Sequence, residues 1–169
     1  MKTKYRIWMA VATLLLIGLY FLPIWSISLE APQYPEGIGL NIHVNTIKGK
    51  APQDLQNING LNHYIGMKKI EPDSIPELSL MPPIIGFLIV TRLVIAVWGN
   101  RKWILAWLVL FGLLAVVGLV DFYIWEYDYG HDLNPDAAIK IPGMSYQPPL
   151  IGSKKILNFT ATSLPHIGF

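Results

Sequence analysis

The sequence of 169 residues contains no cysteine, and this absence removes several kinds of site at once. Without thiols the chain has no disulfide, no thiolate zinc site, no iron–sulfur cluster and no cysteine nucleophile. Charge is also scarce, because Asp, Glu, Lys and Arg make up 14% of the residues, against roughly 25% in a typical soluble domain. The net charge is only +2 and no basic run exceeds two residues, so the composition gives no support for nucleic-acid binding.

Sequence motifs of the common enzyme classes are missing as well. The sequence has no Gly-x-Ser-x-Gly, no His-Glu-x-x-His, no P-loop and no Gly-x-Gly-x-x-Gly motif. These motifs mark nucleophile elbows, zinc proteases and nucleotide-binding loops, and none of those sites is therefore predicted. We expect a protein that is not an enzyme.

Hydrophobic residues make up 53% of the sequence and are concentrated in three blocks. Ile7–Trp25 and Trp103–Trp125 have the length of about 20 residues that a membrane-spanning helix requires, whereas Pro83–Trp98 is shorter and contains Arg92. Only Gly99–Lys102 separates the second block from the third, which predicts a helical hairpin. No small-x-small cleavage site follows the first block, so we expect a retained anchor. The blocks predict a mainly α membrane protein with three transmembrane helices.

The distribution of charge predicts how these helices are oriented. The first six residues and the Gly99–Lys102 turn carry five Lys and Arg residues and no acid, whereas all eleven acids lie after Trp25. The positive-inside rule then places the N-terminus in the cytoplasm and the C-terminus in the periplasm of a bacterium, with the inner membrane between them. The expected parts are an N-terminal anchor (1–25), a periplasmic segment (26–82), a transmembrane hairpin (83–125) and a Pro-rich, ordered periplasmic tail (126–169).

Arg92 and Asp121 are the charged residues inside the hairpin blocks. At 1.5 Å per residue, Arg92 lies about 9 Å from the Trp98 end of its helix, and Asp121 lies about 27 Å beyond Trp103. The two side chains therefore lie at different depths and cannot pair. We favour an Arg92 side chain that extends to the cytoplasmic headgroups. The alternative is a polar contact between Arg92 and a partner subunit.

The two periplasmic stretches are expected to form a small, irregular α/β part. Gly37–Thr46 alternates apolar and polar residues, which predicts a half-buried strand. Asp54–Met67 carries apolar residues at helical spacing, and Gly60 and Gly66 leave open whether it forms one short helix or two half-helices. Residues 70–83 contain four prolines and are expected to run irregularly back to the membrane.

The C-terminal stretch, residues 126–169, combines prolines with many apolar side chains. Its Ile, Leu and Phe residues give it surface to bury, which a disordered tail lacks, so we expect it to pack over residues 26–82. Four acids at the start of this stretch superficially resemble a calcium loop. They lack the glycine and the closing glutamate of an EF-hand, so a proline-fixed acidic turn is favoured. These acids are Glu126, Asp128, Asp132 and Asp136.

Imidazole and thioether side chains gather on the outward side, which holds all four histidines and three of the five methionines. Such ligands without thiolate favour copper, particularly Cu(I). His63 and Met67 stand four residues apart, a spacing that places both side chains on one face of a helix. Met81, His131 or Met144 are candidates for the remaining ligands. The same spacing also arises when a methionine packs in the core and a histidine lies in solvent.

Two segments carry a resemblance to a known family. The first reads DLQNINGLNHYIGM at Asp54–Met67, and the second reads PGMSYQPPLIG at Pro142–Gly152. Together with the three hydrophobic blocks, they resemble small bacterial membrane proteins that accompany the copper-maturation factors of nitrous oxide reductase. The resemblance implies a role in periplasmic copper supply. It points to four metal ligands, His63, Met67, Met144 and His131, and leaves His43 and His166 outside the two segments.

The sequence therefore predicts a non-enzymatic inner-membrane protein that holds Cu(I) on the periplasmic side and delivers it to a copper enzyme or a copper chaperone. Neutral ligands that exchange one at a time suit such a transfer. The alternative is a structural accessory subunit of a larger membrane complex, which would explain the ordered tail, the short second block and Arg92. Haem binding is a distant third, because no two histidines lie at opposed positions of the spans.

Overall fold

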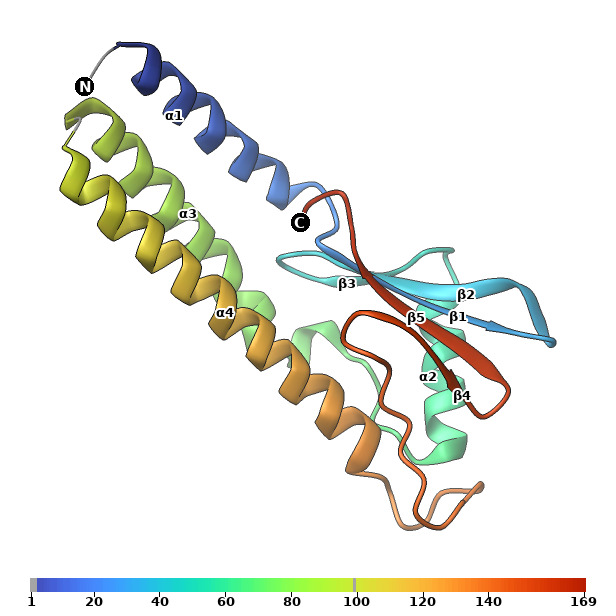
Figure 1. The fold of residues 1–169 in the computed structure, drawn as a ribbon. Helices are drawn as coiled ribbons and strands as arrows, with labels where there is room; N and C mark the ends of the chain where they lie inside the picture. Colours follow the sequence, from blue (N-terminus) through green and yellow to red (C-terminus); the bar gives the residue numbers. More distant parts are fainter. Residues whose placement is uncertain (1–2, 99) are drawn as a thin grey trace.

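The computed structural model describes residues 3–98 and 100–169 and contains two regions (Figure 1). Helices α1, α3 and α4 lie side by side in one region, and a sheet with α2 against one face forms the other. The helices are α1 (Thr3–Ile17), α2 (Asp54–Ile65), α3 (Pro76–Trp98) and α4 (Arg101–His131), with short 3-10 turns η1 (Gly18–Tyr20) and η2 (Pro72–Ser74). The strands are β1 (Trp25–Ala31), β2 (Tyr34–Ile42), β3 (Ile47–Gly49), β4 (Gly152–Ile156) and β5 (Phe159–Pro165).

The five strands form one antiparallel sheet in the order β3-β2-β1-β5-β4. The central strand β1 pairs with β2, where Trp25 lies opposite Ile42, and with β5, where Trp25 lies opposite Pro165. The C-terminal stretch therefore packs on residues 26–82 by adding two strands to their sheet. One outer strand, β4, carries Lys154 and Lys155, and charged lysines on an edge strand discourage pairing with another chain.

The core of the sheet region joins the sheet to the end of α4. Trp25, at the start of β1, is 4% exposed, and its indole Nε1 donates a hydrogen bond of 2.7 Å to the Ser163 hydroxyl oxygen of β5. Its ring also makes edge contacts with Phe122 of α4 and with Phe169, at centroid distances of 5.3 and 5.6 Å. One side chain thus connects two strands, a helix and the C-terminal residue.

Two helices, α3 and α4, are long and apolar enough to cross a membrane. Within the protein, 17% of the most apolar stretch of α3 and 6% of that of α4 are buried, which separates them from the core helices of a soluble domain. At 1.5 Å per residue the 31 residues of α4 extend about 46 Å, more than the ~30 Å of a hydrocarbon core. Helix α4 is therefore long enough to cross a bilayer and still extend its last turns into the sheet region.

The prediction of a mainly α protein with three transmembrane helices was wrong. The apolar part of α1, Ile7–Tyr20, is shorter than a membrane span, so the described residues provide two candidate spans. The predicted first block ran on to Trp25 because the sequence stays apolar there, but Pro23 follows the η1 turn and Trp25 begins β1. The part expected to be irregular is a regular five-stranded sheet, and the fold is mixed α/β.

The first helix of the hairpin, α3, also begins earlier than the sequence predicted. Helix α3 starts at Pro76, and Pro82 and Pro83 lie inside it, so residues 76–83 are helical and not irregular. Proline is tolerated at the first position of a helix, which Pro76 occupies. Further along the helix, the Tyr20 hydroxyl donates a hydrogen bond of 2.6 Å to the Pro82 carbonyl oxygen. Helix α4 begins after Asn100, whose side chain accepts a hydrogen bond from the backbone N–H of Lys102 and caps the helix.

Local predictions in the segment between α1 and α3 hold well. Strand β2 covers most of the predicted strand Gly37–Thr46, and α2 is a single helix that Gly60 does not interrupt. It ends at Gly66, which has a left-handed conformation with φ +81°, so this position favours glycine. Asp54 at its start is buried and accepts hydrogen bonds of 3.0 and 3.1 Å from the backbone N–H groups of Gly39 and Ala51.

Candidate functional site

His63 and Met67 line one surface depression at the end of α2. Its volume is about 390 Å³, and its other lining residues are Gln56, Asn59, Gly60 and Lys69. We call this region the His63 depression. His63 is exposed and Met67 is half-buried, so the imidazole is open to a partner molecule. The sequence predicted that the two residues share one face of a helix, but α2 ends at Ile65 and Met67 lies past it.

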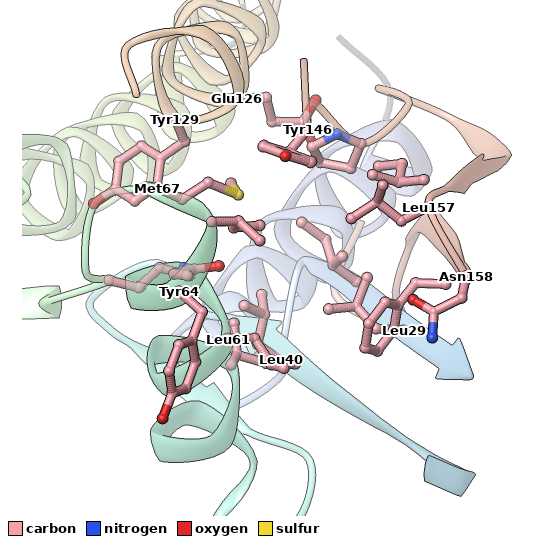
Figure 2. A pocket seen from close by; sticks show the side chains of 18 of the residues that line it. Leu29, Leu40, Leu61, Tyr64, Met67, Glu126, Tyr129, Tyr146, Leu157 and Asn158 are labelled. Carbon is pink, nitrogen blue, oxygen red and sulfur yellow. The ribbon is translucent and has the colours of Figure 1, made fainter. Parts of the chain in front are cut away.

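The direction of the Met67 side chain differs from that of a residue inside a helix. Helix α2 ends at Ile65, and the chain turns at Gly66, so Met67 lies just past the helix with its N–H bonded to the Asn62 carbonyl oxygen at 2.9 Å. Figure 2 shows the Met67 sulfur directed into a second cavity. Met67 therefore lines two cavities, and its thioether faces the second one.

His131 and Met144, the two further predicted ligands, do not line the His63 depression. His131 is the last residue of α4; its ring stacks on Tyr127 at a centroid distance of 3.9 Å, and its Nδ1 lies 2.9 Å from the Tyr127 carbonyl oxygen. Met144 is half-buried in the loop before β4. An ion pair of 2.6 Å between Lys68 and Asp132 joins the neighbours of Met67 and His131 in the chain.

The remaining histidines lie elsewhere. His43 follows β2, and its partial burial lowers the pKa of its imidazole, with nearby Lys48 and His166 adding to the effect. Met81 is half-buried in α3. Within residues 3–98 and 100–169, no three side chains among His, Asp and Glu are grouped so that they could hold a metal ion. Methionine is not among these three residue types, so Met67 and Met144 remain predicted ligands.

The second cavity lies between the sheet, α2, the end of α4 and the loop before β4, and we call it the Glu126 cavity (Figure 2). Its volume is about 300 Å³, and aliphatic and aromatic side chains form most of its lining. Glu126 is 0% exposed, and among the described residues neither of its carboxylate oxygens has a hydrogen-bond partner. Removing a carboxylate from water without a partner costs several kcal/mol, so this position requires an explanation.

The burial of Glu126 depends on a close contact between α4 and the tail. Tyr146 donates its backbone N–H to the Gly130 carbonyl oxygen at 2.9 Å. A Cβ atom at Gly130 would lie only 2.4 Å from the backbone nitrogen of Gln147, so only glycine permits this approach. The loop thus covers the last turns of α4, and Figure 2 shows Glu126 and Tyr146 together at one end of the cavity.

The burial of Glu126 was not predicted, because the last hydrophobic block ends at Trp125 and Glu126 was assigned to an acidic turn. An available signal was the helical spacing of Phe122, Glu126 and Tyr129, which continues the helix past Trp125. No pattern of this kind predicts the loop that buries the Glu126 carboxyl group. Comparison of the chain with protein-family models, with curated proteins and with solved structures found no match.

Proposed function

We propose that this membrane protein holds Cu(I) at the His63 depression and delivers it to a copper enzyme, of the nitrous oxide reductase type, or to a copper chaperone. The observation that carries the proposal is that His63 and Met67 line the same depression, although the Met67 sulfur faces the Glu126 cavity and has to turn toward His63 to bind the same ion. An imidazole and a thioether are ligands that suit Cu(I) better than Mg²⁺ or Ca²⁺. Gln56 and Asn59, which complete much of the lining, are uncharged.

The exposure of the site supports transfer rather than storage. His63 and Met67 supply two ligands, and the exposed His63 imidazole leaves room for ligands of a partner protein. Ligands that are replaced one at a time allow the ion to move without passing through water as a free ion. His131 and Met144 are the ligands of this chain that we propose for a fuller coordination shell, because the Lys68–Asp132 ion pair brings the end of α4 toward Met67.

Cu(I) titration of two variants tests the site. His63→Ala is expected to abolish stoichiometric Cu(I) binding, because it removes the imidazole. Met67→Leu is expected to weaken binding about tenfold or more while changing the free energy of unfolding by less than about 1.5 kcal/mol, because the volume is conserved. Competition with a chromogenic Cu(I) chelator under reducing, oxygen-free conditions measures the affinity.

Matched controls for these variants are His166→Ala and Met9→Leu, which change the same residue types outside the His63 depression. Both controls are expected to bind Cu(I) like the unmodified protein. If His63→Ala and Met67→Leu also retain full occupancy, copper binding at this depression is refuted.

We also propose that the sheet region faces the periplasm and that the α3–α4 turn faces the cytoplasm. Both ends of the sheet region join the same side of the hairpin, before α3 and after α4. Arg101 and Lys102 lie at the opposite end, which agrees with the positive-inside rule. Two residues of the earlier charge argument, Lys2 and Gly99, lie outside the described residues.

Reporter fusions test this orientation. Alkaline phosphatase fused after Phe169 is expected to be active, because the enzyme matures only outside the cytoplasm, whereas a fusion placed after Lys102 is expected to be inactive. A green fluorescent protein fused at the same two positions is expected to give the opposite pattern. An inactive phosphatase after Phe169 would reverse the proposed orientation and place the His63 depression in the cytoplasm.

A second candidate function is that of an accessory subunit, and one contact within the hairpin favours it. The Arg92 guanidinium lies over the Trp107 ring, 4.6 Å from its centroid. Its Nη1 atom is buried and has no hydrogen-bond partner among the described residues. A polar residue of another membrane subunit would satisfy this nitrogen, and such a role is compatible with copper delivery inside an assembly.

A further inference from the structure

The Glu126 cavity has the size and the lining of a small-molecule site. Its volume of about 300 Å³ is at the lower end of the range found for ligand pockets. At about 30 Å³ for each water-sized group, it has room for about ten non-hydrogen atoms. Strands β1 and β2, helix α2, the end of α4 and the β4–β5 hairpin all contribute apolar side chains to it. It is therefore enclosed by elements from both halves of the chain.

Two neighbouring residues of the cavity carry polar groups that are buried and unpaired. Among the described residues, both carboxylate oxygens of Glu126 lack a hydrogen-bond partner, and the indole Nε1 of Trp125 lacks one as well. Leaving a buried donor or acceptor unpaired costs about 1–3 kcal/mol for each group. Such groups in the wall of an apolar cavity are typical of a binding site, in which the ligand supplies the missing partners.

The charges around the cavity decide between kinds of ligand. No lysine, arginine or histidine is among its described lining residues, so an anionic ligand would face Glu126 without a counter-charge. An ammonium group would pair with Glu126, but it has no lone pair to accept a hydrogen bond from Trp125. A hydroxyl group donates one hydrogen bond and accepts another, and it enters an apolar cavity without burying a second charge.

We propose that the Glu126 cavity binds a neutral amphipathic alcohol of about ten non-hydrogen atoms. The hydroxyl donates to the Glu126 carboxyl and accepts from the Trp125 indole, while the hydrocarbon part lies against the apolar side chains of the sheet and α2. Trp125, Glu126 and Tyr129 of the lining belong to the last two turns of α4, which brings the cavity close to the proposed membrane surface, where a lipid-soluble alcohol gathers. This inference does not depend on copper binding at the His63 depression.

The test compares four probes that share one skeleton: 4-phenylbutan-1-ol, 4-phenylbutylamine, 4-phenylbutyrate and butylbenzene. Calorimetric titration is carried out on the full chain in lipid nanodiscs, with empty nanodiscs as the blank for partitioning. The alcohol is expected to bind at least about tenfold more tightly than butylbenzene, because it pairs the two buried groups. Equal affinity for the alcohol and butylbenzene, or tighter binding of the amine or the carboxylate, overturns the proposal.

Three variants assign the preference to the cavity. Glu126→Leu is expected to remove the roughly tenfold preference for the alcohol over butylbenzene. Glu126→Gln, which keeps a hydrogen-bonding group of the same size, is expected to retain it within a few-fold. Glu36→Gln, an exposed glutamate of β2, is the matched control and is expected to change nothing. If Glu126→Leu fails to fold, Trp125→Phe serves instead, because it removes the indole N–H and keeps an aromatic ring. An unchanged preference in the folded Glu126→Leu or Trp125→Phe protein refutes the site.

Discussion

Replacing Trp25 with alanine is expected to lower the free energy of unfolding of the sheet region by about 3–5 kcal/mol. Trp25 is 4% exposed at the start of β1, and its removal leaves a cavity between β5, α4 and the C-terminal residue. It also removes the edge contacts with the rings of Phe122 and Phe169. Loss of this one side chain therefore weakens the attachment of the sheet to α4.

Thermal or denaturant unfolding in detergent, followed by near-ultraviolet circular dichroism, measures this effect. Ser163→Ala separates the hydrogen bond from the burial of Trp25, because it removes the acceptor of the Trp25 indole N–H. It also removes the hydrogen bond of 3.2 Å that the Ser163 hydroxyl donates to the Leu150 carbonyl oxygen. Its expected cost is about 1 kcal/mol, since the indole then remains as an unpaired buried donor. A Trp25→Ala protein that is as stable as Ser163→Ala would contradict the described core.

The second large effect is expected at Gly130, where α4 meets the tail. Gly130→Ala places a Cβ atom 2.4 Å from the Gln147 backbone nitrogen, so the loop must move away from α4. Overpacking of this kind costs about 1–3 kcal/mol, which exceeds the gain of up to about 1 kcal/mol that alanine gives in a helix. The expected result is a lower unfolding temperature and faster tryptic cleavage at the exposed Lys140.

Gly118→Ala is the matched control, because Gly118 lies in the same helix and a Cβ atom there has nothing within 4 Å. This variant is expected to be as stable as the unmodified protein or slightly more stable. Cleavage at Lys140 is expected to stay slow in it. If both glycine variants behave alike, the tail does not approach α4 as described, and the burial of Glu126 is wrong with it.

Patterns that are local in the sequence predicted local structure correctly. The alternation around Gly39 predicted most of β2, and the helical spacing after Asp54 predicted α2. Hydropathy located the two helices of the hairpin but not their ends, because a helix does not stop where its apolar side chains stop. Helix α4 continues to His131 with polar residues that the sheet region covers.

The sheet was harder to predict because its strands are far apart in the sequence. Trp25 reads as the last residue of an apolar block, and only its pairing with Ile42 and Pro165 makes it a strand residue. Strand β4 has no apolar alternation, since it is an outer strand with exposed lysines. The same reason applies to the candidate sites, because Glu126 is buried only by a loop 20 residues further along, at Tyr146.

The position of β5 in the sheet also constrains the order in which the protein can assemble during synthesis. Strand β5 pairs with β1, so the backbone of Glu30 cannot pair with that of Thr160 until β5 has been synthesised. Both long apolar helices are synthesised in between. Until then one edge of β1 has unpaired backbone groups, which are a template for pairing with other chains. Folding of the sheet is completed only after both helices have been synthesised, and it depends on contacts of long sequence separation, which form slowly. The nascent protein is therefore most vulnerable to aggregation before its last strand leaves the ribosome.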